Sequence, residues 1–94
     1  MYLIKRTKDF EKSFKKLKRV GLTKKTRDTL EFVIDNLASN KKLEEKYKDH
    51  QLRGELGFFR ECHILNDLLL IYKIEKNELI LVLVDIGSHA QLFG

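Results

Sequence analysis

The sequence predicts one α+β domain over residues 1–94, with a short first strand, a two-helix hairpin and an antiparallel sheet of three to four strands packed against the helices. Two observations lead to this prediction. Apolar residues recur with helical periodicity over residues 8–38, whereas residues 58–86 hold three apolar runs separated by turn residues. The length of 94 residues, with 43% apolar and 35% charged residues, suits one small globular core.

The first half begins with an alternating segment and continues with a basic amphipathic helix. Residues 2–6 alternate as in a short strand, Thr7 is then a suitable N-cap, and Gly21 can end the helix. The apolar face of this helix carries Phe10, Phe14 and Leu17. The opposite face is a basic ridge that points to solvent, formed by Lys8, Lys12, Lys15, Lys16, Lys18 and Arg19.

A second helix is predicted from Thr23 to about residue 38, because apolar residues recur on one of its faces. This stripe consists of Leu30, Val33, Ile34 and Leu37. Ser39 and Asn40 then break the helix. The charged residues 41–48 have weak periodicity, so they are predicted to connect the helices to the sheet, with one helical turn near residues 43–46.

The second half changes to strand character after Gly57. It has three apolar runs of strand length, separated by Asn-Asp and Lys-Asn turns, at residues 58–65, 68–75 and 79–86. Such an order predicts an antiparallel meander. The last run is apolar on both alternating faces, which favours a central strand covered on both sides. Gly87 ends it, and residues 89–93 are predicted to form a short tail.

Positive charge is concentrated in the first half of the chain. Residues 1–49 hold 15 Lys and Arg against 8 Asp and Glu, and residues 50–94 hold 4 against 6, so the net charge of +5 divides into +7 and −2. A basic half is typical of proteins that bind a polyanion, with nucleic acid or an acidic protein as candidates. It also occurs on helices that only face solvent.

The chain is predicted to act in the cytoplasm without membrane contact. Its longest apolar run, residues 79–84, has six residues, far fewer than the about 20 that cross a bilayer, and residues 1–10 lack the features of a secretory signal. The single cysteine, Cys62, cannot form an internal disulfide, and we expect it to be a buried small apolar residue.

All three histidines, His50, His63 and His89, lie in separate elements of the second half, which a meander would bring together at one edge. Histidine gives and takes protons near neutral pH, and RNA cleavage needs both transfers, one from the attacking 2′-hydroxyl and one to the departing 5′-oxygen. This chemistry needs neither a metal nor a cofactor. Zinc is the alternative, but separations of 13 and 26 residues match no short zinc motif. Any one of these histidines alone is more often structural.

Alternation along residues 58–65 places Glu61 and His63 on one face of the strand and Arg60 on the other. Glu61 is therefore predicted to orient His63 or hold it protonated, and Asp67 in the next turn is predicted to act similarly on another group. Arg60 is a candidate cation for the phosphate, provided that a bulge or strand end turns it toward His63.

Two aromatic residues, Tyr47 and Phe93, are candidate contacts for RNA, because proteins often stack aromatic rings on single-stranded bases. Each is equally well explained as a core residue. The basic ridge is predicted to contact RNA phosphates through Lys12, Lys15, Lys16 and Arg19.

Four short motifs follow one another in the second half: YKDHQL, RECHIL, NDLLLIYKI and GSHAQLF. On these motifs the chain resembles the YafQ branch of the RelE toxin superfamily over nearly its whole length, while the first half is similar only in pattern and charge. The resemblance implies a RelE-like fold and a ribosome-associated endoribonuclease of a type II toxin-antitoxin system. Such a toxin cuts mRNA, inhibits translation and is neutralised by a co-expressed antitoxin.

The resemblance also implies which residues form the site. The residues that match the family's catalytic and base-contacting positions are His50, His63, Asp67, His89 and Phe93. Glu61 is a departure, because the family often has aspartate there, a side chain one methylene shorter. The antitoxin is expected to be acidic, because it would cover a basic protein.

Two other functions fit the same sequence. A ParE-like inhibitor of DNA gyrase would have this fold without needing the histidines, and a basic RNA-binding module would have no activity of its own. Early loss of translation in expressing cells would favour mRNA cleavage, whereas early DNA damage would favour gyrase inhibition.

Overall fold

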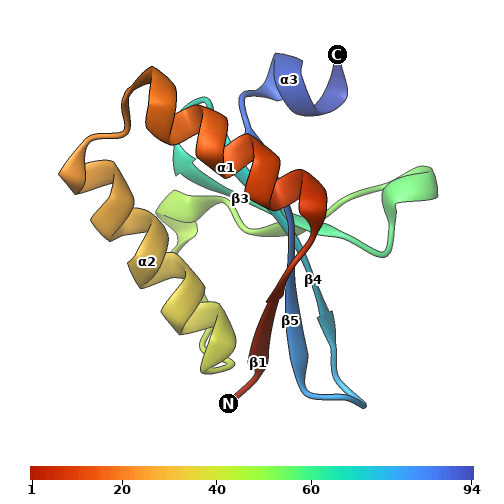
Figure 1. The fold of residues 1–94 in the computed structure, drawn as a ribbon. Helices are drawn as coiled ribbons and strands as arrows, with labels where there is room; N and C mark the ends of the chain where they lie inside the picture. The colour runs from red at the N-terminus through yellow and green to blue at the C-terminus, as the bar shows by residue number, and fades with distance from the viewer.

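Two helices cover one face of a five-stranded sheet in the computed structural model, which describes residues 1–94 (Figure 1). The elements are β1 (Leu3–Arg6), α1 (Lys8–Gly21), α2 (Lys24–Ala38), β2 (His50–Gln51), β3 (Arg60–Leu65), β4 (Leu68–Glu75), β5 (Ile80–Gly87) and α3 (His89–Phe93). Single 3₁₀ turns, η1 (Glu45–Tyr47) and η2 (Gly54–Leu56), flank β2. The predicted α+β class and the order of the main elements are confirmed.

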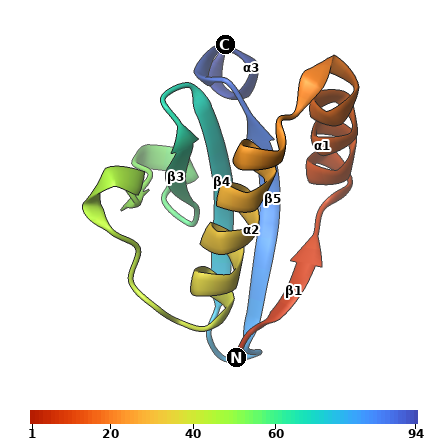
Figure 2. The same cartoon turned by 90° about the vertical axis from the view of Figure 1, so that its left-hand side faces the viewer.

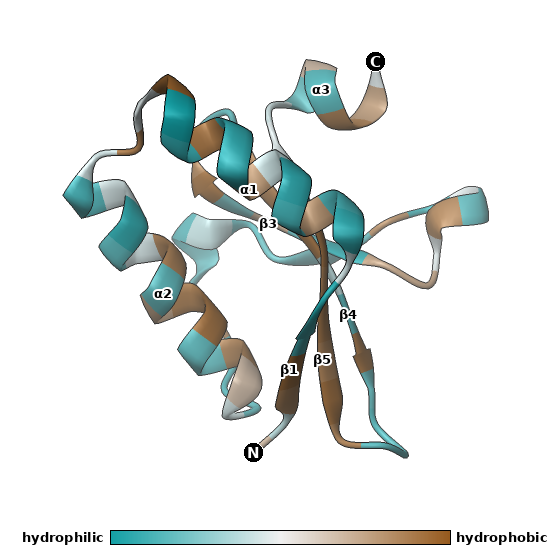
Figure 3. Cartoon of the chain, in the orientation of Figure 1, coloured by the Kyte–Doolittle hydropathy of each residue, from teal (hydrophilic) through white to brown (hydrophobic).

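Hydroxyl side chains fix where both long helices begin. Thr7 Oγ1 accepts the N–H of Phe10 at 3.0 Å, and Thr23 Oγ1 accepts the N–H of Thr26 at 3.1 Å. Thr7 also donates to the carbonyl of Val84 at 2.6 Å, which links the start of α1 to β5. Figure 3 shows that α1 is largely hydrophilic, whereas β5 is hydrophobic along most of its length.

The sheet has the order β1-β5-β4-β3-β2, so the predicted meander of β3, β4 and β5 forms its centre. Neighbouring strands are antiparallel, except that β1 lies parallel to β5, with Leu3 beside Ile80. The expected antiparallel sheet of three to four strands is therefore a mixed sheet of five. The difference arises because β1 joins β5 in parallel and the two-residue β2 extends the far edge.

The main core lies between the helices and the inner face of the sheet, and Figure 2 shows α2 crossing that face. Its fully buried members include Val33 from α2, Leu70 from β4 and Leu81 from β5. Cys62 is fully buried there as a free thiol, as predicted. Burial, together with the nearby carboxylates of Asp49 and Glu61, raises the pKa of this thiol, so Cys62 remains neutral.

Two segments differ in detail from their predicted form. The strand expected over residues 58–65 begins only at Arg60, after η2. The expected tail is a short helix, α3, whose start has a capping box: Ser88 Oγ accepts the N–H of Gln91 at 3.2 Å, and Gln91 Oε1 accepts the N–H of Ser88 at 2.8 Å. None of the helices combines the length and the apolar character that crossing a membrane would need.

Candidate active site

The carboxylate of Glu61 lies between two imidazoles on the face of the sheet opposite the helices. Glu61 Oε2 is 3.1 Å from His50 Nε2 and 3.9 Å from His63 Nε2. β2 brings His50 there by pairing directly with Glu61, and His63 lies two residues further along β3. The predicted common face of Glu61 and His63 is confirmed, and the structure adds His50 to them.

Glu61 is a buried carboxylate, and burying a charge costs free energy unless nearby groups compensate it. Its side chain is 5% exposed, while those of His63 and His50 are 20% and 50% exposed. Glu61 Oε1 has no hydrogen-bond partner, so the only compensation for the carboxylate comes from the imidazoles beside Oε2. Glu61 Oε2 can accept a hydrogen bond from the nearer imidazole, that of His50, when its Nε2 carries a proton.

The backbone before β2 sets the orientation of the His50 ring. His50 Nδ1 is 2.6 Å from the carbonyl oxygen of Lys48, which can only accept, so Nδ1 carries a proton. Lys48 has a left-handed backbone with φ of 50°, which places this carbonyl. A hydrogen bond between His50 Nε2 and Glu61 then needs one further proton, shared by the imidazole and the carboxylate. The pair can therefore give or take a proton at a surface that a substrate can reach.

A second polar network lies on the inner face, directly beside the first. Asp49 Oδ2 accepts a hydrogen bond from Arg60 Nη2 at 3.1 Å, and its other oxygen accepts one from the hydroxyl of Tyr72. Arg60 Nε donates to the same hydroxyl at 3.2 Å. Because Asp49 precedes His50 and Arg60 precedes Glu61, this network holds β2 against β3 and so positions His50 beside Glu61.

Both proton donors of this network keep their protons. Burial, followed by the hydrogen bond to Asp49, raises the pKa of the Tyr72 hydroxyl. Burial alone would lower the pKa of Arg60, but the hydrogen bonds to Asp49 and Tyr72 outweigh it and raise that pKa. Tyr72 is therefore a stable neutral donor and Arg60 a stable cation.

Two of the residues expected to contact RNA have other partners. Arg60 lies on the inner face and is bonded to Asp49 and Tyr72, so it is directed away from His63. Alternation without a bulge at this point explains its place. Tyr47 is 8% exposed and belongs to the core, which is the alternative weighed for it from the sequence.

The third histidine begins α3, where Asp67 anchors it. Asp67 Oδ1 accepts the backbone N–H of His89 at 2.9 Å, so this carboxylate positions the helix. The rings of His89 and Phe93 lie one helical turn apart, with centroids separated by 5.1 Å. In the sheet register His63 is beside Leu69, which is beside Gly87, so α3 starts at the same end of the sheet as His63. The structure thus joins two histidines at Glu61 and places the third on a neighbouring helix.

Part of the basic ridge faces a hollow between α1, the end of β5 and α3. The cations that line it are Lys12, Lys16 and Arg19. Gln91 and Leu92 of α3 line its other side. Lys15, the fourth predicted contact, is exposed on α1 but does not line this hollow.

The fold and the site together define a small, basic α+β protein with a cluster of histidine and carboxylate side chains on one face of its sheet. The family model described as "Bacterial toxin of type II toxin-antitoxin system, YafQ" matches residues 2–94. The chain belongs to this family, as its four motifs predicted.

Known proteins similar to this chain agree with that assignment. The "mRNA interferase toxin YafQ" of Escherichia coli strain K12 is 34% identical over 91 residues, which cover 93% of this chain and 97% of the relative. A crystal structure of a metal-bound toxin from Helicobacter pylori is 46% identical with a TM-score of 0.90, covering 99% of this chain and 100% of that one. The toxin of the E. coli DinJ-YafQ complex is 28% identical with a TM-score of 0.86, and both chains are covered completely, at 100%.

The metal in the H. pylori structure belongs to that protein. In this chain, no group of three or more His, Cys, Asp and Glu side chains is arranged to hold a metal ion.

Proposed function

We propose that this chain is the toxin of a type II toxin-antitoxin system and an endoribonuclease that cleaves mRNA in the cytoplasm, which inhibits translation. The observation that carries the proposal is the buried carboxylate of Glu61 between His50 and His63. The name of the E. coli relative, an mRNA interferase, supports it.

The proposed reaction uses acid–base chemistry without a metal or other cofactor. The 2′-oxygen of one nucleotide attacks the adjacent phosphorus, and the bond from phosphorus to the 5′-oxygen of the next nucleotide breaks. One imidazole takes the proton of the 2′-hydroxyl, and another in its charged form gives a proton to the departing 5′-oxygen. The products are a 2′,3′-cyclic phosphate and a 5′-hydroxyl. Glu61 keeps a proton available by stabilising the charged form of the imidazoles.

The helix α3 supplies the remaining parts of the proposed site. His89 is a third proton-transfer or phosphate-stabilising group, and Phe93 stacks on an mRNA base, a contact that its partly exposed ring permits. Asp67 acts as a positioning residue, because it holds the first turn of α3 to the β3–β4 turn.

The basic ridge of α1 is proposed to bind ribosomal RNA. Phosphate contacts from lysine and arginine are electrostatic, so ribosome binding should weaken steeply as salt concentration rises. The residues concerned are Lys12, Lys15, Lys16 and Arg19.

An acidic antitoxin is the proposed protein partner. The E. coli DinJ-YafQ complex shows a protein of similar fold bound to its partner. The net charge of +5 on this chain, concentrated as +7 in residues 1–49, favours a negatively charged one.

The test is an incubation of purified protein with translating ribosomes and a defined mRNA, with EDTA present and with the new RNA ends mapped. The wild type should produce discrete ends, and His63→Ala should reduce them about 100-fold or more, because one acid–base group typically contributes that much. Wild-type cleavage by His63→Ala would contradict the proposed site. DNA damage in expressing cells, without early loss of translation, would instead favour gyrase inhibition.

A further inference from the structure

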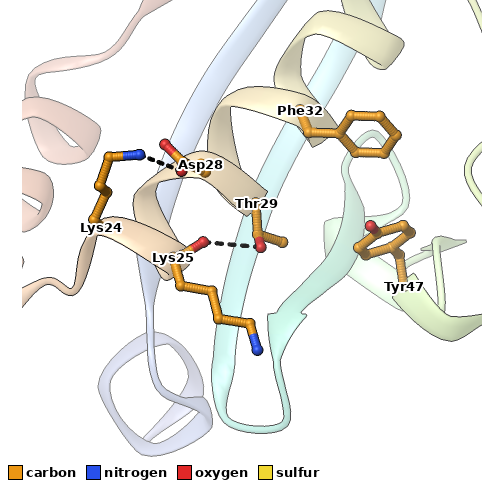
Figure 4. A pocket seen from close by; sticks show the side chains of 6 residues that line it. All are labelled: Lys24, Lys25, Asp28, Thr29, Phe32 and Tyr47. Carbon is orange, nitrogen blue, oxygen red and sulfur yellow. Dashed lines mark hydrogen bonds and ion pairs between the residues drawn. The ribbon is translucent and has the colours of Figure 1, made fainter.

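Two hollows lie beside α2, near the end of β3. The first is lined by residues 63–65 at the end of β3, by Asn66, by Lys46, Tyr47 and Lys48, and by Thr29 of α2. The second is lined by Lys24, Lys25, Asp28, Thr29, Phe32 and Tyr47 (Figure 4). Because Thr29 and Tyr47 line both, the two hollows adjoin each other, and together we call them the α2 groove.

The α2 groove carries uncompensated positive charge. Its one lining carboxylate, Asp28, is paired with Lys24 at 3.1 Å. Lys25, Lys46 and Lys48 are exposed and form no ion pair. Figure 4 shows the amino group of Lys25 extending away from Asp28. Three ammonium groups without a carboxylate partner along the groove favour a ligand with repeated negative charges.

An aromatic ring is available at the far end of the same groove. Phe32 is 51% exposed, although α2 buries other apolar residues against the sheet. The buried ring of Tyr47 supports it from one side, with centroids 6.4 Å apart, and Lys46 Nζ lies 5.2 Å from the centre of the Tyr47 ring. An exposed ring next to free lysines is suited to stacking a nucleobase whose phosphates those lysines contact.

We propose that the α2 groove binds single-stranded RNA continuous with the strand cleaved at His63. Lys25, Lys46 and Lys48 contact its phosphates and Phe32 stacks on one of its bases. This proposal rests on the proposed function, because it is the reacting strand at His63 that enters the groove. His63 is one of the residues that line the groove, which favours RNA over an acidic peptide, because the proposed chemistry of His63 acts on RNA.

The experiment measures binding and cleavage separately, in charge-matched variants. Binding of a labelled single-stranded RNA of about 12 nucleotides, within the usual site size for such proteins, is followed by fluorescence anisotropy at low salt. The variants are K25E/K46E and Phe32→Ala. The control is K5E/K76E, which changes the net charge equally at two exposed lysines outside the groove. Circular dichroism confirms that each variant is folded.

The expected results distinguish this proposal from the proposed function. K25E/K46E should weaken RNA binding about tenfold or more and Phe32→Ala about fivefold, while K5E/K76E should weaken it less than about twofold. The proposal is overturned if K25E/K46E binds RNA as tightly as K5E/K76E, or if it loses only the binding of an acidic antitoxin peptide. A wild type that binds RNA through the groove but cleaves no mRNA would contradict the proposed function and leave the groove assignment supported.

Discussion

Arg60 and Glu61 are neighbours on β3, but their side chains lie on opposite faces of the strand, and their charges are compensated to different degrees. On the inner face, Arg60 has hydrogen bonds to Asp49 and Tyr72. On the outer face, Glu61 has one oxygen without a partner and the other beside two imidazoles. A network with every group satisfied stabilises a fold, whereas a buried charge with incomplete compensation is typical of a reactive site. The inner network therefore suits a structural role, and the outer one suits the proposed chemistry.

Glu61→Gln should have the largest effect, because it removes the charge that stabilises the imidazolium form. Cleavage should fall about 100-fold or more, with little change in Tm, since the lost carboxylate had an unsatisfied oxygen. Ribosome-dependent mRNA cleavage and thermal unfolding measure the two quantities. Glu75→Gln is the matched control, because Glu75 forms only a surface pair with Lys73 at 3.1 Å. Wild-type cleavage by Glu61→Gln would contradict the proposed catalytic role of the outer face of β3.

Asp49→Ala should reduce stability more, and cleavage less, than Glu61→Gln does. Arg60 and Tyr72 both lose their acceptor, so the free energy of unfolding should fall by about 1–3 kcal/mol, as determined by urea denaturation. Cleavage should fall by a smaller factor than in Glu61→Gln, because His50 loses its support but remains present. A variant as stable as the wild type would show that the inner network does not stabilise the fold.

Gly87→Ala should act locally on α3. A Cβ at this position would lie 2.9 Å from Gln91 Oε1, which belongs to the capping box of α3. Loss of the cap should destabilise α3 by about 1 kcal/mol, detected as faster hydrogen exchange there, and reduce cleavage while leaving Tm nearly unchanged. Ser88→Ala removes the other hydrogen bond of the capping box without a clash and should have a similar effect; if it does not, the capping box is not what maintains α3.

The smallest expected effect is a loss of stability at alkaline pH. The pKa of Tyr72 is raised in the folded state, so the unfolded chain loses this proton first and the free energy of unfolding should fall as pH rises above about 10. Tyr72→Phe should show a shallower fall over that range. Urea midpoints at several pH values measure it, and Cys62 contributes equally to both proteins. Parallel pH profiles would mean that folding does not raise the pKa of the Tyr72 hydroxyl.

The sequence predicted those parts of the fold that depend on local pattern. Thr7 could be identified as a cap, and Thr23 as the start of the second helix, because both signals need only nearby residues. β2 has two residues, too few to show an alternation, and the pairing of β1 with β5 joins segments that are distant in the chain. The helix α3 had a usable signal, since Ser88 and Gln91 have the spacing of a capping box.

In the candidate site too, the sequence predicted what depends on one strand but not what depends on contacts between distant segments. Alternation alone placed Glu61 with His63 and Arg60 opposite them, because both statements concern one strand. The contact of His50 with Glu61 depends on β2, and the roles of Asp49 and Tyr72 depend on three segments meeting on the inner face. No local sequence pattern predicts contacts between such distant segments. The hydroxyl of Tyr72 within an apolar strand was nevertheless a sign, because a buried hydroxyl needs a hydrogen-bond partner.

The parallel pairing of β1 with β5 also sets when a newly made chain can fold. Residues Leu3–Arg6 pair with residues 80–83, which are synthesised much later. Contacts so distant in sequence form late and slowly, and until then β5 lacks its neighbour on one side. The complete sheet therefore assembles only after β5 has been translated, so β1 waits without a strand partner while both long helices are being made.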